Sequence, residues 1–255
     1  MTNFAPLKNS LLLCIDDAMR QLPIRGPFLD VGCGHGDVSA HMAGHGLTGT
    51  AIDLSEAALV KAEALLQGLP VQVVHGSIET GPRDYGCILF MDVLEHVRDD
   101  ADLIGRATAR LIDGGHMLIS VPSNPREWRW DDDFYGHVRR YTVPDLEAKL
   151  RAHGLRTQIV WDFTFPTFWL MRRMYTRIKA EPPETEPDEM TRTMASSVNP
   201  AHSMPIISPI LAATTALWQP IIWLQFRLFR KQVTRGHEMF VVARRVAPAS
   251  PPEPA

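Results

Sequence analysis

The chain has 255 residues, 45% of them hydrophobic and 22% charged, a balance that excludes disorder throughout and predicts one globular domain with an elaboration. Its net charge of -3 gives no general positive field, so we expect no nucleic-acid partner. The three cysteines, Cys14, Cys33 and Cys87, are odd in number and form no CxxC pair. This spacing argues against a disulfide framework and a zinc site, and suits a reducing cytoplasmic setting. Asp16 and Asp17 end the only early apolar run, so we expect no signal peptide.

An N-terminal helical segment over residues 1–26 is expected first. From residue 27 to about residue 121, short apolar runs alternate with helical stretches, which predicts βαβ units and a parallel sheet with helices on both faces. The expected strands cover residues 27–31, 48–52, 71–74, 87–91 and 116–121. One helix is expected to begin after Ser55, its N-cap, and to end before Gly68, a stop signal. A further helix is expected from about Asp100 to Leu111.

The character of the chain changes after residue 121. An aromatic and charged loop leads to an expected helix over residues 144–153 and a strand over residues 155–160. Residues 161–235 are predicted to form an apolar helical cap inserted into the core, and residues 181–200, rich in Pro, Glu, Ser and Thr, a flexible excursion within it. Residues 236–246 are the expected last strand, and residues 247–255 an expected disordered tail.

One stretch of this cap is long enough to span a bilayer. Residues 193–226 contain no Lys, Arg, Asp or Glu, and the apolar part runs from Ile206 to Phe226. Pro205, Pro209 and Pro220 argue against a crossing, and so does the following strand, which has to stay with the sheet. We therefore expect a helical cap, or a helix in the membrane interface with its basic end near lipid phosphates.

The strongest chemical signal is a strand that runs into a glycine-rich turn, FLDVGCGHGD, over residues 28–37. Gly32, Gly34 and Gly36 let the backbone approach a ligand closely because they lack a Cβ. A dinucleotide requires GxGxxG, whereas here Asp37 takes the place of the third glycine and Asp30 adds negative charge where a pyrophosphate would bind. A carboxylate at this position suits a cation such as S-adenosylmethionine.

The segment LDVGCGHG resembles the first motif of class I S-adenosylmethionine-dependent methyltransferases, and four later segments resemble the family's further motifs in the right order. The resemblance covers about residues 25–160. It implies an α/β, Rossmann-like fold with a seven-stranded, mostly parallel sheet whose last strand is antiparallel. The cofactor-binding positions that it implies are Asp30, Gly32, Cys33, Gly34, Gly36, Asp53, Leu54, Ser77, Ile78, Met91 and Asp92.

Individual roles follow from the same resemblance. Asp53 would bind both ribose hydroxyls, because a carboxylate can accept two hydrogen bonds from a diol. Leu54 would touch the adenine. The family often has Asp where this chain has Ser77, so the contact to the adenine amine departs from the pattern.

The segment GHVRRYTVPDLEAKLRAHGL, over residues 136–155, resembles the branch that contains ubiquinone-pathway O-methyltransferases and many tailoring enzymes. It implies methyl transfer to the oxygen of a small acceptor. His96 and His137 are the candidate general bases for a hydroxyl acceptor, whereas Arg139 or Arg140 would orient a carboxylate. Trp128 and Tyr135 are further candidate substrate contacts.

The apolar sequence after Trp161 favours an apolar or lipid-like acceptor, such as a prenylated quinone. Arg227, Arg230 and Lys231 would let the protein meet the inner face of a membrane peripherally. Two alternatives stay open: an oxidoreductase that uses a nicotinamide cofactor, and a non-catalytic, membrane-associated interaction module that retains the fold.

Structural roles for the singled-out side chains also stay open. His96 could cap or pack a helix, His137 could brace its arginine-rich loop, and Trp128 could seal a core. His41 and His45, with the nearby His35, have no carboxylate or Cys at an adjoining ligand spacing. We therefore expect a solvated helix face there and no metal.

Overall fold

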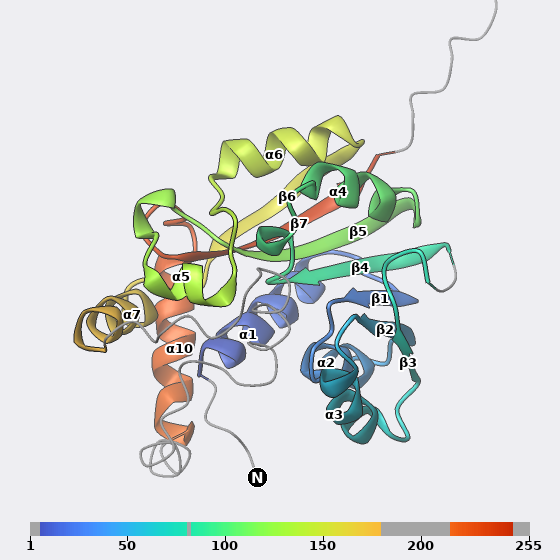
Figure 1. Cartoon of the computed structure of the whole chain (residues 1–255), viewed down its shortest axis with the longest axis horizontal. Helices are drawn as coiled ribbons and strands as arrows, with labels where there is room; N and C mark the ends of the chain where they lie inside the picture. The colour runs from blue at the N-terminus through green and yellow to red at the C-terminus, as the bar shows by residue number, and fades with distance from the viewer. Residues whose placement is uncertain (1–5, 81–82, 180–214, 247–255) are drawn as a thin grey trace, which may run out of the picture.

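The computed structural model describes residues 6–80, 83–179 and 215–246 (Figure 1). The expected flexible stretch over residues 181–200 and the expected tail over residues 247–255 lie outside the described residues. Residues 206–226, considered above as a membrane crossing, are described only from residue 215 onward. Within the described part of the chain, no helix is both long and apolar enough to cross a membrane.

A seven-stranded sheet with the order β3-β2-β1-β4-β5-β7-β6 organises the molecule. Only β7 runs antiparallel to its neighbours, β5 and β6, so the predicted α/β Rossmann-like fold is confirmed. The strands are β1 (Phe28–Val31), β2 (Gly49–Asp53), β3 (Val71–His75), β4 (Tyr85–Met91), β5 (Leu111–Pro122), β6 (Leu155–Asp162) and β7 (Glu238–Arg245).

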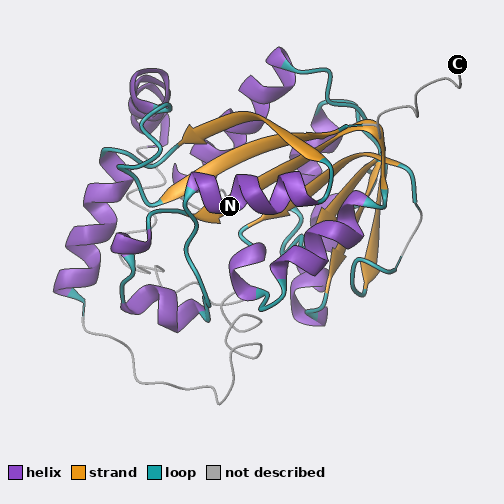
Figure 2. Ribbon diagram, turned by 90° about the horizontal axis from the view of Figure 1, so that it is seen from above, coloured by secondary structure: helices purple, strands orange, loops and turns teal. Residues whose placement is uncertain are grey.

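Helices cover both faces of this sheet (Figure 2). The α-helices are α1 (Pro6–Gln21), α2 (Asp37–Gly44), α3 (Glu56–Leu66), α4 (Asp100–Thr108), α5 (Trp130–Tyr135), α6 (Val143–Ala152), α7 (Thr167–Ile178) and α10 (Thr215–Phe229). Two short 3-10 helices, η1 (Leu94–His96) and η2 (Pro125–Glu127), lie in the loops after β4 and β5. The predicted cap of α3 forms: the Ser55 hydroxyl accepts a hydrogen bond from the amide of Ala58 at 3.3 Å.

The alternating side chains of the central strands form a separate core on each face of the sheet. Along β4, Ile88 and Phe90 join one cluster, whereas Cys87 and Leu89 join the other. This alternation follows from the two-residue period of a strand that is covered on both sides. Helices α4 and α6 pack on the first face, and α1 on the second, where Phe226 of α10 also lies.

One boundary differs from the sequence prediction. The helix expected to reach Leu111 ends at Thr108, because Leu111 already pairs with Tyr85 as the first residue of β5. The side chain of Leu111 is buried there. Gly114 and Gly115 follow within β5, in the part where its register against β4 shifts.

Candidate functional site

A pocket of about 680 Å³ opens at the carboxyl ends of the parallel strands. Its walls come from the loops after β1, β2, β3 and β4, from α5, and from the N-terminal residues Leu7 and Lys8 of α1. Strand β1 lies between β2 and β4, so the chain order reverses at this edge. Open α/β sheets bind ligands at such a reversal point.

Asp53 and Gly32, the first glycine of the turn, line one end of this pocket. All three glycines of the turn have positive φ, and the value at Gly34 is 54°. The two carboxylate oxygens of Asp53 accept hydrogen bonds from the amides of Gly34 and Ser55, each at 2.8 Å. Each oxygen keeps a further lone pair, so a neighbouring diol can still bind to this carboxylate. A Cβ on Gly36 would lie 3.0 Å from the side chain of Leu66. A larger residue would therefore crowd the contact between the start of α2 and α3.

Asp30 lies in β1, just before this turn, and does not line the pocket. Its buried carboxylate accepts a hydrogen bond from the hydroxyl of Ser39 at 2.6 Å. Burial and, to a smaller extent, the charge of Asp53 raise the pKa of Asp30 to about 6 against the opposing effect of the hydrogen bond from Ser39. Burial likewise raises the pKa of the Cys33 thiol.

The predicted cofactor residues divide into two sets. Gly32, Asp53, Leu54, Ser77, Ile78 and Asp92 line the pocket, whereas Asp30, Cys33, Gly34, Gly36 and Met91 lie outside its lining. The hydroxyl of Ser77 donates to Glu79 at 2.5 Å, and Glu79 pairs with Arg106. These two partners lower the pKa of Glu79 to about 2. Ser77 therefore offers its oxygen as an acceptor, which is also the role of the ionised Asp common in the family.

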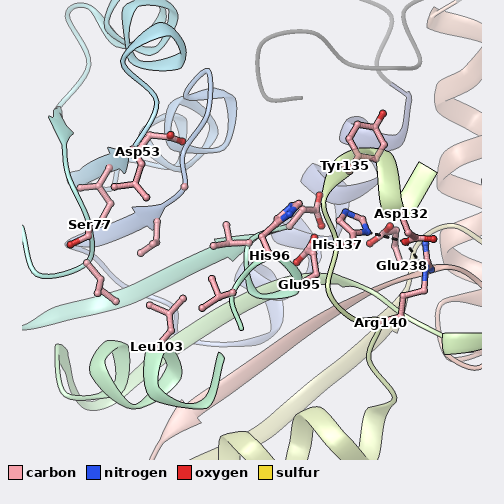
Figure 3. Close-up of a pocket in the computed structure, with 18 of the residues that line it drawn as sticks. Asp53, Ser77, Glu95, His96, Leu103, Asp132, Tyr135, His137, Arg140 and Glu238 are labelled. Atoms are coloured by element: carbon pink, nitrogen blue, oxygen red, sulfur yellow. Dashed lines mark hydrogen bonds and ion pairs between the residues drawn. The ribbon is translucent and has the colours of Figure 1, made fainter. Parts of the chain in front are cut away.

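At the other end of the pocket, His137 and Asp132 form a hydrogen-bonded pair, as Figure 3 shows. Nδ1 of His137 lies 2.8 Å from Oδ1 of Asp132. Hydrogen bonds from His137 and the nearby charges of Arg140 and Arg172 hold the pKa of Asp132 well below its usual range, despite its burial. An ionised carboxylate only accepts, so Nδ1 of His137 carries a proton, and in the neutral imidazole the lone pair is on Nε2.

His96 lies beside His137, with ring centroids 4.9 Å apart. Its Nδ1 donates to the carbonyl oxygen of Gly136 at 3.3 Å, since a carbonyl can only accept. Burial, reinforced by the neighbouring His137, lowers the pKa of His96 to about 4. His96 is therefore neutral at physiological pH and adds no positive charge next to His137.

Three carboxyl groups enclose this end of the pocket. Asp92 lies on its inner wall and accepts a hydrogen bond from Ser120 at 2.8 Å, while its side chain is open to the hollow. Neither carboxyl oxygen of Glu95 has a hydrogen-bond partner among the described residues, and the same holds for Oε2 of Glu238. Burial raises the pKa of Glu95 and of Glu238 well above the usual range, and the charge of Asp92 raises both further. A carboxyl group that stays protonated can donate as well as accept, so both groups can form hydrogen bonds with polar groups of a ligand.

The four predicted substrate residues are not all at the pocket. Tyr135 and Arg140 line it, but Arg140 is buried and braces the loop through Asp132 and the carbonyl oxygens of Ser123 and His237. Arg139 turns away and pairs with Asp100 at 2.6 Å. Trp128 also lies outside the lining, and its indole donates to Asp133 at 3.2 Å.

Several pocket residues were missed by the sequence analysis. Glu95 precedes His96 directly, and Asp132 lies five residues before His137, so attention to the neighbours of the histidines could have found both. Arg172 and Glu238 carry no such signal, because they reach the pocket from α7 and β7, far along the chain.

The pocket also contains a possible set of cation ligands. One ligand atom each of Glu95, His96 and His137 lies within 4.8 Å of the others. Two imidazoles and a carboxylate are a donor set that transition metals accept.

Comparison with known proteins assigns the chain to a family. A family model described as a methyltransferase domain matches residues 11–158, more than half of the chain. The ubiquinone biosynthesis O-methyltransferase of Marinobacter nauticus is 38% identical over 109 residues, which cover 39% of this chain and 46% of that protein. The enzyme of the same name from Photorhabdus laumondii is 33% identical over 107 residues, which cover 39% and 45%. The chain thus matches about half the length of these curated relatives.

Solved structures show the same fold. An S-adenosylmethionine-dependent methyltransferase from Mesorhizobium loti has a TM-score of 0.55 and 16% identity, with 90% of this chain and 96% of that chain covered. A 1,6-didemethyltoxoflavin-N1-methyltransferase from Burkholderia thailandensis, solved with bound S-adenosylhomocysteine, has a TM-score of 0.54 and 17% identity, with coverages of 95% and 79%. The match to a methyltransferase model does not support the alternative of a nicotinamide-dependent oxidoreductase. The chain belongs to the class I S-adenosylmethionine-dependent methyltransferase family.

Proposed function

We propose that the protein transfers the methyl group of S-adenosylmethionine to a hydroxyl oxygen of a small-molecule acceptor, with His137 as general base. The observation that carries this proposal is the His137–Asp132 pair at one end of the pocket whose other end holds Asp53 (Figure 3). The O-methyltransferase names of the curated relatives agree with it.

The cofactor would occupy the Asp53 end. Its ribose hydroxyls would donate to Asp53, whose oxygens are already oriented by the amides of Gly34 and Ser55. Its adenine would lie between Leu54 and Ile78, with its amine donating to the oxygen of Ser77. The sulfonium would then face Asp92 and the histidines, and the negative charge of Asp92 would favour the cationic methyl donor.

Methyl transfer is an in-line displacement, in which the acceptor oxygen forms a bond to the methyl carbon while the carbon–sulfur bond breaks. The sulfur keeps the electron pair and leaves as S-adenosylhomocysteine. The proton of the hydroxyl passes to Nε2 of His137, and Asp132 stabilises the imidazolium that forms, as the carboxylate of a catalytic triad does. A positioned base of this kind contributes on the order of 10² to 10⁴ in rate.

A divalent cation on Glu95, His96 and His137 is a second way to activate the hydroxyl, favoured by the proximity of their ligand atoms. The metal would lower the pKa of the bound hydroxyl and make a protein base unnecessary. Turnover that survives dialysis against EDTA supports the base, whereas turnover that is lost with EDTA and restored by a divalent cation supports the metal.

The acceptor would be a hydroxylated molecule with further polar groups, since Glu95 and Glu238 present carboxyl oxygens without described partners. A lipid or quinone tail could contact the exposed apolar side chains of α10, among which Trp223 and Leu228 are 54% and 61% exposed. Arg227 lies on the same helix and could meet lipid phosphates at the inner face of a membrane. Sedimentation with anionic vesicles at low salt tests this part: it should pellet the wild type and leave Trp223→Ser with Leu228→Ser in the supernatant. Failure of the wild type to pellet would refute it.

The release of S-adenosylhomocysteine from S-adenosylmethionine, measured over a panel of phenols, alcohols and carboxylic acids, tests the proposed reaction. We expect turnover with hydroxyl acceptors that depends on His137. Turnover with carboxylic acids alone, which need no base, would contradict the role of His137.

A further inference from the structure

A second cluster of ligating side chains lies outside the pocket, between α1 and α2. His41 and His45 are one helical turn apart, and their Nε2 atoms lie 2.7 Å and 2.8 Å from the same oxygen, Oδ1 of Asp16. The two rings are 5.0 Å apart between centroids. In the sequence, Asp16 is 25 residues from His41, so ligand spacing could not reveal this cluster.

Helical geometry holds both histidines in place. The amide of His45 still bonds to the carbonyl oxygen of His41 at 3.2 Å, so both side chains leave the same face of the helix. A histidine pair at positions i and i+4 is a common metal-binding arrangement on helices. The third member, Asp16, lies on α1 and brings an anionic oxygen to the point where both Nε2 atoms converge.

The charges around Asp16 also suit a cation. Its neighbour Asp17 pairs with Arg20 and Arg230, whereas no ion pair of the described residues gives Asp16 a Lys or Arg partner. The only described partners of the Asp16 carboxylate are two imidazoles, which are neutral when they act as ligands. The side chains of Asp16, His41 and His45 are 30%, 23% and 35% exposed, which leaves a path for an ion from solvent.

We propose that Asp16, His41 and His45 bind one divalent transition metal of the Zn²⁺ type, which clamps α1 to α2. Zinc takes nitrogen and oxygen ligands at about 2.0 to 2.1 Å, which places neighbouring ligand atoms of a tetrahedron about 3.3 Å apart. The two observed separations would have to lengthen by only about half an ångström. Solvent water completes the coordination.

The clamp would act on the wall of the pocket. Helix α1 contributes Leu7 and Lys8 to the lining, and Lys8 pairs with Asp37, the first residue of α2, at 2.5 Å. The ion would tie the second half of α1 to the last turn of the helix that the glycine turn opens. Metal binding therefore holds in place the segment that borders the pocket.

Metal binding to the full chain tests the proposal directly. After removal of metals with EDTA, equilibrium dialysis against Zn²⁺ and the visible absorption of added Co²⁺ report the site. We expect about one equivalent in the wild type and in the control His35→Ala, and an affinity weaker by at least about tenfold in His41→Ala, His45→Ala and Asp16→Asn. Circular dichroism should show every variant folded, since these side chains are partly exposed.

Two further comparisons make the test decisive. Hydrogen exchange in α1 should slow on addition of Zn²⁺ to the wild type, and stay unchanged in His41→Ala. No binding by the wild type, or binding that survives in His41→Ala and His45→Ala but is lost in His96→Ala, would overturn the site. A bound ion that leaves exchange in α1 unchanged would overturn the clamp.

Discussion

Replacement of His137 by Asn separates the chemical role of Nε2 from the structural role of this side chain in holding Asp132. The Asn amide can still donate to Asp132 from about the position of Nδ1, where the histidine bonds at 2.8 Å, but nothing replaces Nε2 as proton acceptor. Loss of a positioned base should lower kcat by about 10² to 10⁴, which corresponds to about 3 to 5 kcal/mol of activation free energy. The affinity for S-adenosylhomocysteine should stay unchanged, because Asp53 lies at the other end of the pocket.

The assay is S-adenosylhomocysteine release with the best hydroxyl acceptor of the panel, together with calorimetric titration of the same variants. His153→Asn is the matched control, since His153 caps the end of α6 away from the pocket and should keep full activity. Unchanged turnover in His137→Asn would refute the general-base role. Equal losses of turnover and of cofactor affinity would show that His137 instead supports the cofactor site.

Three further substitutions test the buried Asp30, the glycine turn and the buried hydroxyl of Tyr141. Because the pKa of Asp30 rises from 3.8 to about 6 in the folded state, stability should fall as the pH rises through that window, by about 3 kcal/mol for a group buried without a charge partner. Urea unfolding at pH 4 and pH 7 should therefore show a smaller pH-dependent loss in Asp30→Asn, and an identical loss would contradict the shift. Gly34→Val forces a side chain onto a backbone with φ of 54° and should weaken S-adenosylhomocysteine binding by at least about tenfold, whereas Gly44→Ala should not. Tyr141→Phe removes the buried hydroxyl that donates to Asp100 at 2.6 Å and should lower the free energy of unfolding by about 1 to 3 kcal/mol without changing cofactor affinity; an unchanged unfolding midpoint would count against it.

Local patterns explain which elements could be predicted from the sequence. Strand β4 is indicated by its own apolar run, and helix α3 by the cap at Ser55 directly before it. Both signals lie within a few residues of the element itself. The start of β5 at Leu111 depends on pairing with Tyr85, a contact that no local pattern reports. The prediction of a helix up to Leu111 was wrong for this reason.

The site shows the same division. The glycine turn and Asp53 lie at the ends of adjacent strands, so the order of the motifs brings them together. Arg139 and Arg140 are neighbours in the sequence, yet one pairs with Asp100 and the other with Asp132, because the loop conformation decides which way each points. Contacts between distant segments, such as that of Asp16 with His41, need the fold itself.

Titration of the purified protein with S-adenosylhomocysteine, beside the Asp53→Ala variant, tests the central claim most directly. Asp53 would offer the cofactor ribose two hydrogen bonds to a charged group, each worth about 1.5 to 3 kcal/mol, so the variant should bind at least about 100-fold more weakly. Saturable binding in the wild type with this loss in the variant is the predicted result. No binding by a folded wild type, or equal binding by both proteins, would contradict the cofactor site and favour a non-catalytic module that retains the fold.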